Sequence, residues 1–126
     1  MTDKEIEAVI LLDPEKRYEY TIKRIADNES LYSAKFTTGD YAIIPYNKTY
    51  LFPIWPACQY CDMVIYGTSM QCVKISLDQF VNEIKDLISS NGWKISTFYL
   101  PNGDYGKITT LNEFCNSLKY ALEDYE

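Results

Sequence analysis

Histidine is absent from the 126 residues of the chain. Its absence removes the most frequent general base, the commonest zinc ligand and the usual titratable switch near neutral pH. Any catalysis would therefore depend on carboxylates, tyrosine, lysine or thiol. Glycine occurs at only five isolated positions, and none of them belongs to a glycine-rich phosphate-binding motif. Nucleotide chemistry is accordingly disfavoured, and we expect no cofactor.

Net positive charge and long apolar runs are also missing. The 12 basic residues are outnumbered by 18 acidic ones, which gives a net charge of −6. Proteins that bind nucleic acid or anionic membranes place Lys and Arg near phosphate groups, so we expect neither as a partner. No apolar run approaches the roughly 20 residues of a membrane span. Residues 1–13 contain no basic region and no small-residue cleavage site of a signal peptide. We expect a cytoplasmic protein with reduced cysteines, as a monomer or homodimer.

The length and composition are those of one globular domain. A chain of 126 residues can bury a hydrophobic core without disulfides or metals. Hydrophobic residues make up 47% and charged residues 24% of the chain, which are ordinary values for a globular protein. We predict a single domain over residues 1–126, in which residues 1–12 form an arm or short helix and residues 13–126 form the core.

Local signals predict where the helices begin. Asp13-Pro14 is typical of an N-cap followed by the first helical residue. Residues 76–79 and 110–113 each have the spacing of a capping box. A further helix is expected after Pro56, with Gly67 at its end. These signals, with the acidic and apolar residues near the N-terminus, indicate four to five helices.

The segments between the helices predict an antiparallel sheet. Alternation and β-forming residues indicate strands at 31–36, 41–46, 50–54, 71–75, 93–100 and 107–108. The first three are expected to form a meander. Pro45 and Pro53 cannot donate to a ladder, so they should lie at an edge or a bulge. We predict an α+β fold: one compact domain with a mainly antiparallel sheet of about five strands and helices packed on it. The expected core comprises Tyr18, Ile22, Trp55, Cys61, Ile65, Ile75, Phe80, Ile84, Leu87, Phe98, Phe114 and Leu118.

One sequence pattern is similar to that of a known family. Ile54-Trp55-Pro56 is followed by Tyr60 and Cys61 about one helical turn later, and then by residues 75–80 with the sequence ISLDQF. This pattern resembles domain-of-unknown-function family 2750, a family of small and mostly bacterial proteins. The resemblance covers residues 13–122 and departs from the family at Cys61, where alanine is more usual. It implies a compact α+β fold, and it implies no activity because none is attached to the family.

Cysteines provide the main candidate for chemistry. Cys58 and Cys61 form a C-x-x-C motif at a predicted helix start, where the helix dipole can lower a thiol pKa, as in thioredoxin-like redox pairs. However, Trp55 precedes the motif by three residues instead of one, and both thiols can equally be small apolar residues on a buried helix side. A zinc site that also uses Cys72 and Cys115 would lack the two close pairs of structural zinc sites. We therefore expect no metal, and we expect the pair to be reduced and slow to react.

Tyrosine is abundant, with twelve residues. Because tyrosine is enriched at protein interfaces, Tyr46, Tyr50, Trp55 and Tyr60 form a candidate interaction patch, although tyrosine also suits half-buried strands. We predict a non-catalytic module that binds a basic protein, for example an immunity-type inhibitor of a basic bacterial toxin, because opposite charges speed association. Two alternatives remain: a small thiol-redox enzyme that uses the C-x-x-C pair, and a small-molecule binder with a pocket beside Trp55.

Overall fold

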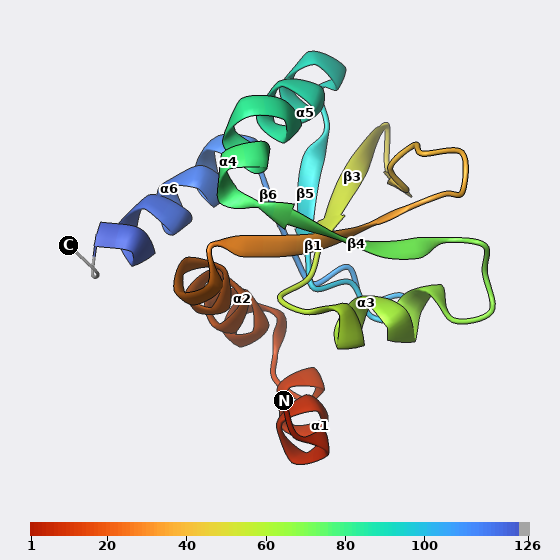
Figure 1. The fold of residues 1–126 in the computed structure, drawn as a ribbon, viewed down its shortest axis with the longest axis vertical. Coiled ribbons are helices and arrows are strands. Elements are labelled where there is room, and N and C mark those ends of the chain that lie inside the picture. Colours follow the sequence, from red (N-terminus) through yellow and green to blue (C-terminus); the bar gives the residue numbers. More distant parts are fainter. Residues whose placement is uncertain (124–126) are drawn as a thin grey trace.

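The computed structural model describes residues 1–123 and confirms the α+β class (Figure 1). The helices are α1 (Asp3–Ile10), α2 (Pro14–Asn28), α3 (Cys58–Ile65), α4 (Leu77–Gln79), the π-helix η1 (Phe80–Ile84), α5 (Lys85–Asn91) and α6 (Leu111–Glu123). The strands are β1 (Ser30–Lys35), β2 (Ile44–Tyr46), β3 (Thr49–Ile54), β4 (Gln71–Ser76), β5 (Lys94–Thr97) and β6 (Lys107–Thr109). In Figure 1, α3 and α5 lie on opposite sides of the ribbon formed by β1 and β4.

The strands form two sheets that are joined by a backbone bridge. β2, β3, β5 and β6 follow one another across a sheet in which only the β3–β5 pairing is parallel, and β1 pairs antiparallel with β4. The sheets meet where the backbones of Tyr32 and Trp55 exchange two hydrogen bonds of 3.1 and 2.9 Å. The predicted meander is thus confirmed only in part for its first strand: β1 forms its ladder with β4, and it meets the predicted strand at 41–46 only in one antiparallel bridge, between Lys35 and Tyr41. Alternating polarity indicates a strand but does not identify its partner.

The two prolines are accommodated in different ways. Pro45 lies in β2 at the edge of the four-stranded sheet, as predicted. Pro53 lies in β3, between β2 and β5, but the β2 pairing ends at Leu51. Beyond that point, the Ser33 hydroxyl donates to the Pro53 carbonyl at 2.7 Å. Because β2 no longer pairs with β3 at Pro53, the absent N–H group of this proline loses no ladder hydrogen bond. This explains how an inner strand can contain a proline.

Three of the predicted helix starts are confirmed by their caps, whereas α3 begins at Cys58, two residues after Pro56, and has no side-chain cap. The Asp13 carboxylate accepts a hydrogen bond from the Lys16 amide at 2.9 Å, and the Ser76 hydroxyl accepts one from the Gln79 amide at 3.1 Å. The side chains of Thr110 and Glu113 accept hydrogen bonds from each other's amides. The π-helical turn of η1 was not predicted from the sequence. None of the helices within residues 1–123 combines the length and apolar character that a membrane span requires.

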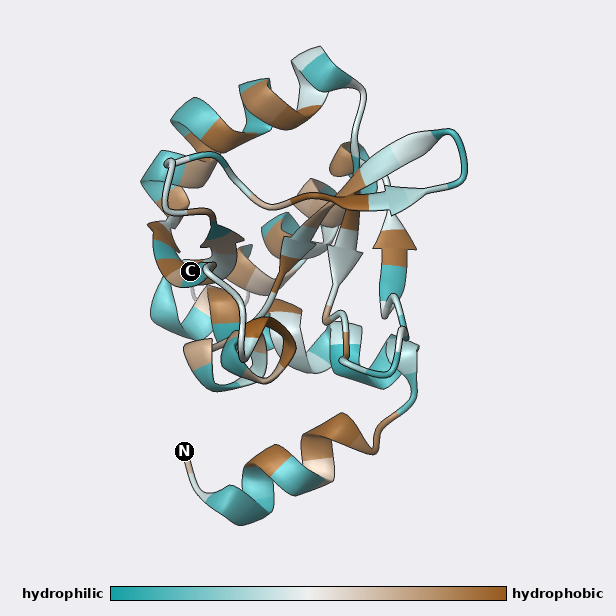
Figure 2. Cartoon of the chain, turned by 90° about the vertical axis from the view of Figure 1, so that its right-hand side faces the viewer, coloured by the Kyte–Doolittle hydropathy of each residue, from teal (hydrophilic) through white to brown (hydrophobic). Residues whose placement is uncertain are grey.

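The core consists of two clusters of buried side chains. The first contains Phe52, Phe80 and Phe114, and the second contains Trp55, Tyr60 and Phe98. Figure 2 shows that the apolar residues of α1 lie toward the rest of the chain, in agreement with the packing of that helix against the second cluster. The predicted core residues are all buried except Leu87, which is half-buried and packs against the first cluster.

Candidate functional site

Two members of the predicted interaction patch are buried, so the patch does not exist as one surface. Trp55 is only 2% exposed, and its indole N–H donates to the Tyr99 carbonyl at 2.9 Å. Tyr60 is fully buried, with its ring centroid 4.6 Å from that of Phe98. Tyr50 is exposed and Tyr46 is half-buried. The prediction is wrong for Trp55 and Tyr60, because the bridge to β1 orients the end of β3 and α3 turns Tyr60 toward the second cluster.

Other tyrosines gather near the surface instead. The ring of Tyr105 lies 5.0 Å from that of Tyr46 and 5.7 Å from that of Tyr99, measured between centroids. All three rings are half-buried, and such edge-on aromatic pairs stabilise each other. The sequence reasoning missed Tyr99 and Tyr105, since both lie in the irregular segment between β5 and β6, whose path local patterns do not predict.

An apolar pocket opens beside Trp55. It has a volume of about 220 Å³, and the twelve residues that line it in the described chain are all apolar: aliphatic, aromatic, proline or, at Met70, a thioether. Its lining comes from segments that are far apart in the sequence. They are the end of β1, residues 42–45, β3 with Trp55, α3, Met70 and Tyr99. The predicted alternative of a pocket beside Trp55 therefore has a physical counterpart.

A shallower hollow adjoins this pocket. It lies over Cys58 and Cys72, has a volume of about 470 Å³, and shares Ile65 and Met70 with the pocket. Tyr66, at its border, is 90% exposed. We call the surface around both openings the apolar face; its apolar members include Phe36, Ile43, Pro45, Tyr66, Met70 and Tyr99, and Asp62 and Gln71 are its polar members at the hollow.

Charge is depleted along the chain segment that builds most of this face. Residues 36–73 contain only three charged side chains, Asp40, Lys48 and Asp62, in 38 residues. The average of the whole chain, 24%, would give about nine in that length. The centre of a protein interface is typically depleted in charge and enriched in aromatic residues and methionine. The composition of the apolar face therefore matches that of an interface better than that of an ordinary solvated surface.

The cysteines pair differently from the prediction. Cys58, the first residue of α3, forms a disulfide with Cys72 in β4, with a Cα–Cα distance of 5.9 Å. Cys61 is buried and free, and its sulfur lies 3.7 Å from the Ser33 carbonyl oxygen. The expectation of a reduced Cys58 is wrong and that of a reduced Cys61 is confirmed, while the alternative of a Cys58–Cys61 redox pair is contradicted. A C-x-x-C spacing cannot show that β4 returns beside the start of α3, and helical periodicity turns Cys61 toward the core.

Cys61 is expected to resist thiol reagents. Burial, with a smaller contribution from Asp62, raises the pKa of its thiol from 9.0 to about 12. At pH 8 this higher pKa leaves about a thousandfold less reactive thiolate than an unperturbed cysteine would have. With a chromogenic disulfide reagent, native protein should therefore show a slow phase that accelerates with pH and becomes fast on unfolding. A rapid phase that disappears in Cys61→Ala would contradict this expectation, and Cys115→Ala is the control for the other free thiol.

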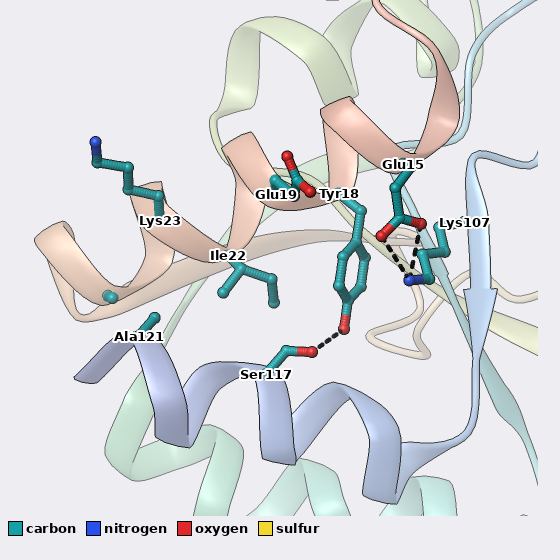
Figure 3. Close-up of a pocket in the computed structure, with 9 residues that line it drawn as sticks. Glu15, Tyr18, Glu19, Ile22, Lys23, Lys107, Ser117 and Ala121 are labelled. Carbon is teal, nitrogen blue, oxygen red and sulfur yellow. Dashed lines mark hydrogen bonds and ion pairs between the residues drawn. The ribbon is translucent and has the colours of Figure 1, made fainter. Parts of the chain in front are cut away.

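A groove between α2 and α6 is one alternative site (Figure 3). It has a volume of about 500 Å³. The Tyr18 hydroxyl donates to Ser117 at 2.7 Å, and Lys107 pairs with Glu15 at 2.9 Å while lying over the Tyr18 ring. Burial raises the pKa of Tyr18, so this hydroxyl stays protonated at neutral pH and is no general base. A ligand would have to displace these mutual bonds, and we therefore regard the groove as a helix–helix joint.

The comparisons with known proteins leave the family and function open. No family model matches the chain, and no curated protein or solved structure is significantly similar to it. The resemblance to domain-of-unknown-function family 2750 therefore stays a prediction based on the residues around Trp55. What distinguishes this molecule is a charge-poor apolar face with a pocket beside that tryptophan.

Proposed function

We propose that this protein is a non-catalytic module that binds another protein through the apolar face. The observation that carries the proposal is the uncharged pocket over Trp55, which opens among accessible aromatic side chains in a charge-poor segment. An apolar patch of this kind on a soluble domain typically marks an interaction site. The thiol-redox alternative has lost its basis, because Cys58 and Cys61 do not pair with each other.

The size of the pocket favours a partner side chain over a free ligand. Sites for drug-sized molecules usually have volumes of about 300–1,000 Å³, whereas this pocket has about 220 Å³. Protein interfaces often place one large anchor residue in a pocket and surround it with weaker contacts that exclude water. The pocket beside Trp55 suits one aliphatic or aromatic anchor, and Phe36 and Tyr66 would cover the area around it.

The edge strand of the four-stranded sheet also favours a partner that binds through its side chains over one that adds a strand. β2 is an edge strand, and Ile44 and Tyr46 are the residues that turn their backbone toward β3. Pro45, between them, occupies the outward-directed position and has no N–H group to donate. Proline at an edge discourages the addition of another strand. We therefore propose an inserted anchor side chain, and not an added strand, as the binding mode.

A basic partner remains the favoured kind. Asp40, in the turn after Phe36, and Asp62, in α3, are acidic and exposed, whereas Lys35, directly before Phe36, is half-buried and its Nζ lies 4.6 Å from the centroid of the Tyr41 ring. Lys48 lies at the turn of the β2–β3 hairpin. With a net charge of −6, the protein should attract a basic partner over a distance limited by screening to about 8 Å at physiological ionic strength. Inhibition of a basic toxin by an immunity-type protein is one activity with these requirements.

Affinity capture followed by a binding measurement tests this proposal. Tagged protein should retain one basic partner from the source cell at low salt and lose it as salt rises. With that partner purified, Phe36→Ser and Tyr66→Ser should each weaken the affinity about tenfold or more, because exposed aromatic residues around an anchor pocket contribute strongly to binding. Tyr120→Ser is the matched control, since Tyr120 is also exposed but lies on α6.

Two outcomes would contradict the proposal. Equal affinity of the wild type and both apolar-face variants would place the interface elsewhere on the molecule. If a small apolar molecule co-purifies with the wild type but not with Trp55 variants, and no protein partner is found, the small-molecule alternative replaces the proposal. In either case the Tyr120→Ser control separates a local effect from a general loss of exposed aromatic surface.

A further inference from the structure

We infer that the Cys58–Cys72 disulfide is a redox-controlled latch that holds one wall of the pocket beside Trp55. The inference rests on the proposed function, because it concerns regulation of the same binding surface. Three observations support it: the position of the pocket wall inside the disulfide loop, the way the loop is otherwise attached, and the accessibility of the sulfur atoms.

The disulfide closes the chain segment that carries the pocket wall. Cys58 and Cys72 are 14 positions apart, so the closed loop contains α3 and the turn that leads into β4. Val64, Ile65 and Met70 all belong to this loop and line the pocket. The opposite wall comes from β1, β3 and the segment before β2, outside the loop. Ile65 is also held by its burial in the second core cluster, so opening the disulfide loosens mainly the Met70 end of this wall and leaves the other side in place.

Few other bonds hold the turn within this loop. The Thr68 amide and hydroxyl donate to the Ile65 carbonyl at 3.0 and 2.6 Å, and the Met70 amide donates to the Thr68 hydroxyl at 3.1 Å. These bonds lie inside the loop and do not tie it to another element. Residues 66–69 are exposed. The β1–β4 ladder ends with the Lys35–Gln71 pair, and the disulfide at Cys72 reinforces this last pair beside the turn.

The sulfur atoms are open to a small dithiol. Both cysteines are half-buried and line the open hollow beside the pocket. A dithiol reductant supplies two electrons and two protons: the S–S bond breaks, Cys58 and Cys72 become thiols, and the reductant becomes a disulfide. Cys61 does not compete, because it is buried and contacts the Ser33 carbonyl. A reducing compartment would thus open the latch, and an oxidising one would close it.

The consequence is a binding surface whose order depends on redox state. With the disulfide closed, Met70 is held opposite Trp55 and the pocket is ready for an anchor side chain. With the disulfide open, the turn gains freedom that a partner must remove on binding, which lowers the affinity. The same freedom gives water better access to the Trp55 ring.

Trp55 fluorescence and amide hydrogen exchange test the latch without any partner. In a Trp93→Phe background, Trp55 is the remaining tryptophan. Dithiothreitol should increase acrylamide quenching of Trp55 and speed amide exchange in residues 66–70 about tenfold, because local opening becomes easier. A Cys58→Ser/Cys72→Ser variant should show the reduced-state values with or without dithiothreitol. Cys115→Ser should respond to dithiothreitol like the wild type.

Several results would overturn the inference. One is unchanged quenching and exchange on reduction of the wild type, a comparison that stands even if the double variant fails to fold. Another is the alkylation of all four cysteines in unfolded protein prepared without reductant. With a purified partner, equal affinity in both redox states would reject the latch and leave the proposed function intact. Absence of binding in both states would reject the proposed function, while the fluorescence result would still decide about the latch.

Discussion

Replacing Trp55 with alanine is expected to lower the free energy of unfolding by about 3–5 kcal/mol, the usual cost of removing a fully packed large aromatic side chain. The ring is 2% exposed and belongs to the second core cluster, together with Tyr60 and Phe98. Its indole N–H also donates to the Tyr99 carbonyl, and that bond is lost with the ring. Equilibrium denaturation in urea, followed by circular dichroism, measures the change.

Trp93→Ala is the matched control for this substitution. Trp93 is half-buried and packs at the border of the first cluster, so its loss should cost clearly less. Trp55→Phe should lie between alanine and the wild type, because a ring is retained while the bond to Tyr99 is lost. A decrease of less than about 1 kcal/mol for Trp55→Ala, within the range of ordinary surface substitutions, would show that the ring does not support the core.

Asp104→Ala is expected to destabilise the protein by about 3 kcal/mol, because it leaves a buried arginine without its counter-ion. Arg17 is 2% exposed and donates to the Asp104 carboxylate at 2.8 Å and to the Leu12 carbonyl at 2.6 Å. Its guanidinium also lies 5.6 Å from the centroid of the Phe98 ring. We expect the lower end of the range for broken buried pairs, since Asp104 itself is 31% exposed and water partly screens the pair.

A double substitution distinguishes the free energy lost with the ion pair from the cost of leaving a buried charge unpaired. Arg17→Met/Asp104→Ala removes both charges while keeping an apolar side chain of similar length in the buried position. The double variant should be more stable than Asp104→Ala alone, because desolvation of an unpaired charge accounts for most of the single-site cost. Equal or lower stability of the double variant in the same denaturation experiment would mean that Asp104 acts through its bond to the Gly106 amide instead.

The Arg17–Asp104 pair also shapes the apolar face. Asp104 belongs to the irregular segment between β5 and β6, which carries Tyr99 and Tyr105. In this segment Phe98 has a φ of +73°, a conformation that is strained for a bulky residue. At Gly106 a β-carbon would lie 2.0 Å from the Thr97 carbonyl oxygen. Contacts with α2 and β5 therefore hold this segment in a path that its own residues would not favour.

Several features of this protein were determined by the sequence alone because their causes are local. Asp13, Ser76 and Thr110 each cap a helix within the next three residues, and such contacts need no distant partner. The inward positions of Phe80 and Phe114 follow from large apolar side chains that any compact arrangement must bury. The α+β class follows from the same local periods of two and 3.6 residues.

Only the tertiary structure decided which distant residues meet. The pairing of β1 with β4, the disulfide from Cys58 to Cys72, and the grouping of Tyr46 with Tyr105 all join residues whose approach depends on the packing of the whole domain. Local preferences are compatible with several such pairings, and the burial of the common core selects among them. The pocket beside Trp55 is a product of that selection, because its walls come from elements that are far apart in the sequence.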